Sequence, residues 1–131
     1  MTVPAPLPPL PRVVNLRHLG LHPGEPLPPG YIYIGHRNQG WRLPRSPWAN
    51  HYVRRGMSPA ARGATLPAYE AFVRRGPDLL AALPGIADAA ALCCWCAGPE
   101  GLDADAPLMC HGQVLLRVLR DGAAPAAPEA G

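Results

Sequence analysis

An unbroken apolar run at residues 89–96 constrains the fold of this 131-residue chain more than any other feature. The run has the length of a strand, and a strand without polar alternation must be covered on both faces. Strands of this kind lie at the centre of parallel sheets, whose connections pass through helices. The run therefore predicts an α/β protein, and the chain length allows one domain with a single modest core.

Two shorter segments nearer the N-terminus predict further strands. Residues Arg12 to Arg17 carry β-branched side chains, and Tyr31 to Ile34 (YIYI) is bounded by a glycine on each side. The segment between them is rich in Gly and Pro, which predicts a loop with turns.

Three helices are predicted in the second half of the chain. One follows an N-cap at Thr65 and ends at Gly76, and a short one covers Pro77 to Leu83 before a Pro-Gly pair ends it. The last helix begins at Cys110 or His111, and its apolar residues recur at helical spacing.

The predicted order is β, β, loop, α, α, β, α. It describes a small single-domain α/β fold, a two-layer or three-layer sandwich with a short, mostly parallel sheet and a long irregular loop. That loop, at residues 35–63, contains three large aromatic side chains, and irregular loops of this length are usually functional. We expect residues 12–121 to form the domain, between a flexible proline-rich lead-in at 1–11 and a flexible Ala/Pro tail at 122–131.

Charge is distributed unevenly along the chain. All twelve basic residues are arginine; ten of them lie in residues 1–75 with two acids, whereas residues 76–131 hold two arginines and seven acids. This asymmetry favours a phosphorylated small molecule or a nucleic acid as partner, although arginines scattered over a solvated surface would give the same count. No apolar run approaches the length of a membrane span, so we expect a cytoplasmic protein without a membrane partner. The oligomeric state is left open.

Four cysteines are crowded into one stretch of the C-terminal half. In a reducing compartment they are thiols or metal ligands rather than disulfides. Cys94 and Cys96 share a face of a regular strand, which makes Cys94, Cys96, Cys110 and His111 the natural set of four ligands. Three thiolates and an imidazole suit tetrahedral zinc, with iron as the second choice. Neighbouring positions on one strand face are too far apart for one ion, so this set requires the strand to end near Trp95.

The same residues allow two other interpretations. Cys96 or Cys110 could be a nucleophile with His111 as its general acid or base, because a helix N-terminus lowers the pKa of a thiol. The cysteines could also be core residues beside a helix-capping histidine, and this interpretation suits Cys93 best. The H-x-E and P-C-x-x-C motifs of zinc deaminases are absent from the sequence, as are the P-loop and the dinucleotide-binding glycine motif.

Several short motifs, read in order, carry a resemblance to a known family. They are VVNLR at 13–17, YIYIG at 31–35, SPWAN at 46–50, CWC at 94–96 and CHGQVLL at 110–116. Together they resemble the small bacterial and phage family named domain of unknown function 4326, over about residues 13–119. The chain departs from the family pattern where His36 precedes Arg37, where His51 replaces a proline, and where GPEGLDAD is inserted before the last motif.

The resemblance implies no established activity, but it indicates which residues could form a site. Beside the cysteines and His111, the polar motif residues of the family correspond to Asn15, Arg17, Arg37, Ser46, Trp48 and Asn50. They would form a pocket for a planar phosphorylated ligand, in which Trp48 stacks and Arg17 or Arg37 binds phosphate. The alternatives are a core position for Trp48 and a surface salt bridge for Arg17.

These observations lead to three hypotheses about function. The first is an enzyme that acts on a nucleotide, nucleoside or nucleic-acid base through a Cys/His centre, with a metal ion or with a thiol nucleophile. The second is a zinc-stabilised module without enzymatic activity that binds nucleic acid or an acidic protein surface. The third is a thiol redox protein.

Overall fold

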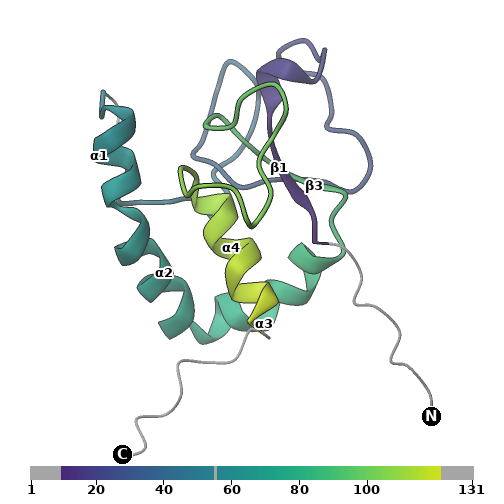
Figure 1. Cartoon of the computed structure of the whole chain (residues 1–131). Helices are drawn as coiled ribbons and strands as arrows, with labels where there is room; N and C mark the ends of the chain where they lie inside the picture. Colours follow the sequence, from purple (N-terminus) through teal and green to yellow (C-terminus); the bar gives the residue numbers. More distant parts are fainter. Residues whose placement is uncertain (1–9, 55, 122–131) are drawn as a thin grey trace, which may run out of the picture.

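The computed structural model describes residues 10–54 and 56–121, and it has the predicted α/β architecture (Figure 1). Its sheet consists of three parallel strands in the order β1-β3-β2, namely β1 (Arg12–Asn15), β2 (Tyr31–Tyr33) and β3 (Ala91–Cys94). The apolar run supplies the central strand, and all four residues of β3 are buried. The proposed tail at 122–131 and most of the proposed lead-in at 1–11 lie outside the described residues.

All three strands are shorter than the sequence predicts, and β2 ends at Tyr33 rather than Ile34. β3 ends at Cys94 rather than Cys96, so the chain has left the strand before Trp95. β1 ends at Asn15 rather than Arg17 and continues as a 3₁₀ turn, η1 (Leu16–His18). The reason is local, because the Asn15 side chain accepts a hydrogen bond from the backbone N–H of Arg17, which caps the turn.

Four α-helices follow in the second half of the described chain. They are α1 (Pro59–Ala64), α2 (Leu66–Arg75), α3 (Pro77–Ala87) and α4 (His111–Arg120). The sequence analysis assigned α1 to an irregular loop, although Ser58 caps it by accepting from the Ala61 N–H. The predicted end of α3 at Leu83 is also wrong. The helix continues through Pro84 because Leu83 and Ile86 are both buried in the core, which offsets the hydrogen bond that proline cannot donate.

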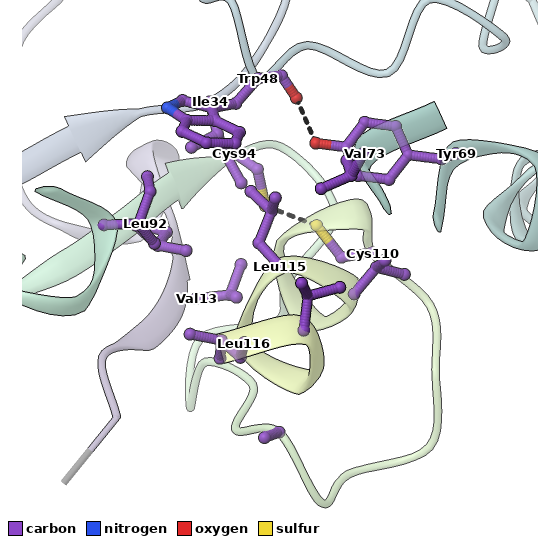
Figure 2. Packing of buried hydrophobic residues seen from close by; sticks show 14 of the residues in the cluster. Val13, Ile34, Trp48, Tyr69, Val73, Leu92, Cys94, Cys110, Leu115 and Leu116 are labelled. Atoms are coloured by element: carbon purple, nitrogen blue, oxygen red, sulfur yellow. Dashed lines mark hydrogen bonds between the residues drawn. The ribbon is translucent and has the colours of Figure 1, made fainter. Parts of the chain in front are cut away.

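The core lies on one face of the sheet. Helix α4 packs between β3 and α2, as Figure 1 shows, while α3 contacts both α2 and α4. Figure 2 shows the packing, whose labelled members include Val13, Ile34, Leu92 and Cys94 from the sheet side and Tyr69, Val73, Leu115 and Leu116 from the helices. Cys93 is also fully buried but does not belong to this cluster.

The N-terminal turn of α4 approaches the sheet very closely at Gly112. A Cβ atom at this position would lie 2.8 Å from Ile34 Cδ1 and 2.8 Å from Val13 Cγ2. Only glycine allows this approach without displacing the sheet. The contact brings Cys110 and His111 next to the C-terminal ends of the strands.

We predict that Gly112→Ala destabilises the protein by about 1–3 kcal/mol, because the added methyl group overpacks the sheet contact. The free energy of urea unfolding measures this effect. Gly85→Ala is the matched control, since a Cβ at Gly85 in α3 meets nothing within 4 Å. There the change should raise stability by about 0.5–1 kcal/mol. Equal effects of the two substitutions would contradict the packing argument.

Candidate functional site

Three cysteine sulfurs converge where β3 ends and α4 begins. The Sγ atoms of Cys94, Cys96 and Cys110 all lie within 4.8 Å of one another, and those of Cys94 and Cys110 are 3.2 Å apart (Figure 2). Because β3 ends at Cys94, the condition that the strand terminate near Trp95 is met. These three cysteines could hold a metal ion.

The turn that carries Cys96 is held in place by Asn15 at the end of β1. The Asn15 side-chain amide donates to the backbone oxygens of Trp95, at 3.1 Å, and Ala97, at 3.0 Å, on either side of Cys96. Its own oxygen accepts from the Arg17 N–H. Asn15 is buried and fully engaged, so in this structure it positions the cysteine turn and leaves no polar atom for a ligand.

Cys110 lies beneath the other two cysteines and caps α4. Its Sγ accepts from the Gly112 N–H, while the Gln113 side chain accepts from the Cys110 N–H, which completes a capping box. The helix end therefore fixes the position of this sulfur.

His111, the first residue of α4, is a candidate fourth ligand. Its Nε2 lies 2.6 Å from the carbonyl oxygen of Ile34, so Nε2 is the nitrogen that donates a proton. Nδ1 keeps its lone pair and lies 3.9 Å from Cys110 Sγ, outside the group formed by the three sulfurs. Burial lowers the pKa of His111 although the hydrogen bond to Ile34 opposes this effect, so the ring is neutral. A neutral imidazole with one N–H on a carbonyl is a common arrangement in metal ligands.

Hydrogen bonds among the sulfurs shift the pKa values of the three thiols in opposite directions. The pKa of Cys96 is lowered because it accepts hydrogen bonds from Cys110 and Cys94, with further stabilisation from the positive charge of Arg62. The pKa of Cys110 is raised by its hydrogen bonds to Cys94 and Cys96 and by burial. For Cys94 the bond to Cys110 lowers the pKa, but the bond to Cys96 and burial outweigh it and raise the value to about 12. Of the three thiols, Cys96 is therefore the one whose pKa is lowered.

A cavity of about 230 Å³ opens onto this cluster. Cys94, Cys96 and His111 form part of its wall. The other lining residues come from the end of β2 and the segment after it, from α1 and from the cysteine turn: Tyr33, Gly35, His36, Arg37, Asn38, Asn50, Val53, Arg62 and Trp95. Cys96 is the partly exposed member of the cluster, whereas Cys94 and Cys110 are both buried.

Only some of the residues that the resemblance indicated line the cavity. Arg37 and Asn50 line the cavity, whereas Asn15, Arg17, Ser46 and Trp48 do not. The Arg17 guanidinium lies over the Trp95 ring, 5.5 Å from its centroid, and forms no surface salt bridge with the described residues.

Trp48 and Ser46 are buried under the loop that follows β2. Trp48 is only 6 % exposed and belongs to the core cluster, and its carbonyl accepts a 2.6 Å hydrogen bond from the Tyr69 hydroxyl (Figure 2). Ser46 Oγ accepts from the Trp48 N–H. The structure therefore has the core position that was the alternative for Trp48, and the ring is not available for stacking on a ligand in the pocket.

Seven lining residues were not predicted from the sequence as site residues, namely Tyr33, Gly35, His36, Asn38, Val53, Arg62 and Trp95. Arg62 lies in α1, in a segment that was assigned to a loop. The signal for this helix was the pair Ser58-Pro59, at which α1 begins. Trp95 could have been found from its position between Cys94 and Cys96, since the proposed ligand set required the strand to end there.

Fold and site together define a small α/β protein with a three-cysteine cluster in a pocket at the end of a parallel sheet. The family described as domain of unknown function 4326 matches residues 17–121 of the chain. The chain belongs to this family, as the motifs indicated, although the match begins after most of the VVNLR segment. No curated protein and no solved structure gives a significant match. None of the described helices is long and apolar enough to span a membrane.

We predict that an alkylating reagent applied to metal-free protein at neutral pH modifies Cys96 before any of the three buried cysteines, Cys93 among them. Cys96 is partly exposed with a lowered pKa, whereas burial raises the pKa of Cys93 to about 12. Above neutral pH the rate at Cys96 should stay flat, because this thiol is already ionised there. Peptide mapping by mass spectrometry measures both rates. A rate at Cys96 that climbs as for an ordinary thiol, with a pKa of about 8.5, would contradict the hydrogen-bonded cluster.

Proposed function

We propose that the protein is an enzyme that binds zinc through Cys94, Cys96 and Cys110 and acts on a nucleotide, nucleoside or nucleic-acid base. One observation carries this proposal: of the three cysteines that could hold the ion, Cys94 and Cys96 lie in the wall of a cavity. Three protein ligands with a fourth position open to a pocket are typical of catalytic zinc sites, whereas structural sites are closed. An ion held there would supply a Lewis acid beside the ligand.

The donor set supports zinc over other ions. Cysteine thiolates are soft ligands that favour zinc, and iron is the second choice with the same donors. In the metal-bound state the thiols of Cys94 and Cys110 would lose their protons, as thiols do on binding zinc. Such a reduced cluster requires a reducing compartment, which supports a cytoplasmic location.

The other walls of the cavity support a planar, anionic ligand. Tyr33 and Trp95 offer aromatic surface, and Arg37 and Arg62 offer guanidinium groups. His111 Nδ1 is unprotonated and belongs to a wall residue, so in this proposal it accepts a proton from the ligand.

The second candidate is a zinc-stabilised binding module without enzymatic activity. It is favoured by the hydrogen bond from His111 Nε2 to Ile34, because this bond leaves Nδ1 free to complete a closed set of four ligands. In that case the ion stabilises the fold and the arginine-rich first half binds nucleic acid or an acidic protein surface.

We expect elemental analysis of protein purified without a chelator or an affinity-tag metal to give about one zinc per chain. Cys96→Ser should lose most of this zinc, because it removes one of three ligands. Cys93→Ala is the matched control: the residue lies next to the cluster but is not part of it, so this variant should keep its zinc. Absence of metal together with a Cys94–Cys110 disulfide would replace the proposal by a thiol redox function.

A chelator separates the enzyme from the binding module. Where zinc is catalytic, its removal should lower the melting temperature only slightly and leave the circular dichroism of the helices unchanged. Where zinc is structural, its removal should unfold the domain, because the binding free energy of such an ion is then folding free energy. Thermal denaturation with and without chelator gives the answer.

A further inference from the structure

We propose that Arg62 and Arg37 bind a phosphate group of the ligand, and that a hydrogen-bond chain from Asn50 through Thr65 holds Arg62 over the pocket. The reaction of that ligand rests on the proposed function, but the binding of phosphate does not depend on a metal ion. The proposal assigns Arg62 a binding role and Asn50 a positioning role.

The charge of the pocket is the first observation. Two arginines bring positive charge to its wall, and no Asp or Glu is among the lining residues in the described chain. Arg12, Arg74 and Arg120 all form ion pairs with acids elsewhere on the surface. Arg37 and Arg62, in contrast, form no ion pair with any residue that the structure describes. Two guanidinium groups at one cavity, without a carboxylate partner among the described residues, favour an anionic ligand.

The geometry of arginine favours phosphate among anions. Each guanidinium offers a planar fork of N–H donors that fits the oxygens of a phosphate group. Arg37 follows β2 and Arg62 lies in α1, so the two forks reach the cavity from separate elements. A tetrahedral group with three terminal oxygens can accept from both forks at once, which a carboxylate with two oxygens does less well.

The volume of the cavity limits the ligand to a small molecule. At about 230 Å³ it is smaller than the roughly 300–1,000 Å³ of pockets that enclose drug-sized ligands. A phosphate and the group attached to it fill such a space, so we commit to a phosphate monoester of nucleotide size, part of which stays outside the cavity.

The second observation is the chain of hydrogen bonds that ends at Arg62. Asn50 Nδ2 donates to Thr65 Oγ1 at 2.9 Å, and Thr65 Oγ1 donates to the Arg62 carbonyl at 2.6 Å. Asn50 is 2 % exposed, and its oxygen accepts from the Tyr52 N–H. The amide is thus used within the protein, and Asn50 acts on a ligand through Thr65 and Arg62.

Helix α1 depends on this chain because its packing is weak. None of its six residues is buried, and its contacts are with α2. Thr65 joins the two helices, and its side chain makes no capping bond to α2, so its hydroxyl serves the link between Asn50 and Arg62. Loss of this hydroxyl should free the end of α1 without unfolding α2.

The binding test uses isothermal titration calorimetry on the full chain with inorganic phosphate and adenosine 5′-monophosphate, and with adenosine as the uncharged control. We expect both phosphates to bind, and Arg62→Gln and Arg37→Gln each to weaken them at least about tenfold, as the loss of a charge-assisted hydrogen bond does. Arg75→Gln on the exposed face of α2 removes the same charge outside the pocket and should leave affinity unchanged. Equal affinity in all three variants, or tighter binding of adenosine, would overturn the proposal.

The positioning role has its own matched pair of variants. Thr65→Val keeps the shape of the side chain but removes the hydroxyl, so phosphate affinity should fall several-fold. Thr65→Ser keeps the hydroxyl and should restore wild-type affinity. The melting temperatures of both variants are measured alongside, and loss of affinity in both variants would contradict the hydrogen-bond chain.

Zinc content measured on the same samples separates this proposal from the proposed function. Phosphate binding that depends on the two arginines, in a protein without metal, supports the phosphate site and overturns the zinc enzyme. One zinc per chain with no binding of either phosphate at millimolar concentration overturns the phosphate site. Tight binding of a nucleic-acid oligomer with no binding of the monophosphate overturns it as well, in favour of a polymeric ligand.

Discussion

The close approach of helix α4 to the sheet is the contact on which the rest of the structure depends. Gly112 lies against Val13 and Ile34, and the same turn of helix begins with Cys110 and His111. A larger residue at 112 would move the helix away from the strands. The sulfur of Cys110 and the ring of His111 would then move with it, away from Cys94 and from the carbonyl of Ile34.

Hydrogen bonds to backbone groups place the remaining parts of the site. Asn15 holds the turn that carries Cys96, and Asn50 holds Thr65 and, through it, the end of α1. Both asparagines are buried, where an amide without partners would be costly. These two asparagines of the family motifs therefore serve as supports in this chain, and the groups that face the cavity include Arg37, which the motifs mark, and others such as Arg62, which they do not.

Periodicity and composition predicted those parts of the fold that depend on local pattern. The apolar run became the central strand, and the last helix begins at His111 as its stripe indicated. The continuation of α3 through Pro84 could not be predicted, because it depends on the burial of Leu83 and Ile86. In the site, the gathering of the cysteines followed from their spacing, but the core position of Trp48 and the place of Arg62 depend on contacts between segments distant in sequence.

The role of Cys110 as helix cap gives the cluster a cooperative character. The Cys110 sulfur accepts a hydrogen bond from the backbone at the N-terminus of α4, and the same sulfur belongs to the group of three. The first turn of the helix and the cluster must consequently form in a single event, since neither has its sulfur in place without the other. Local fraying at this helix end is thereby coupled to the integrity of the cluster, and an evolutionary replacement of Cys110 by an ordinary capping residue such as serine would preserve the helix and lose the cluster.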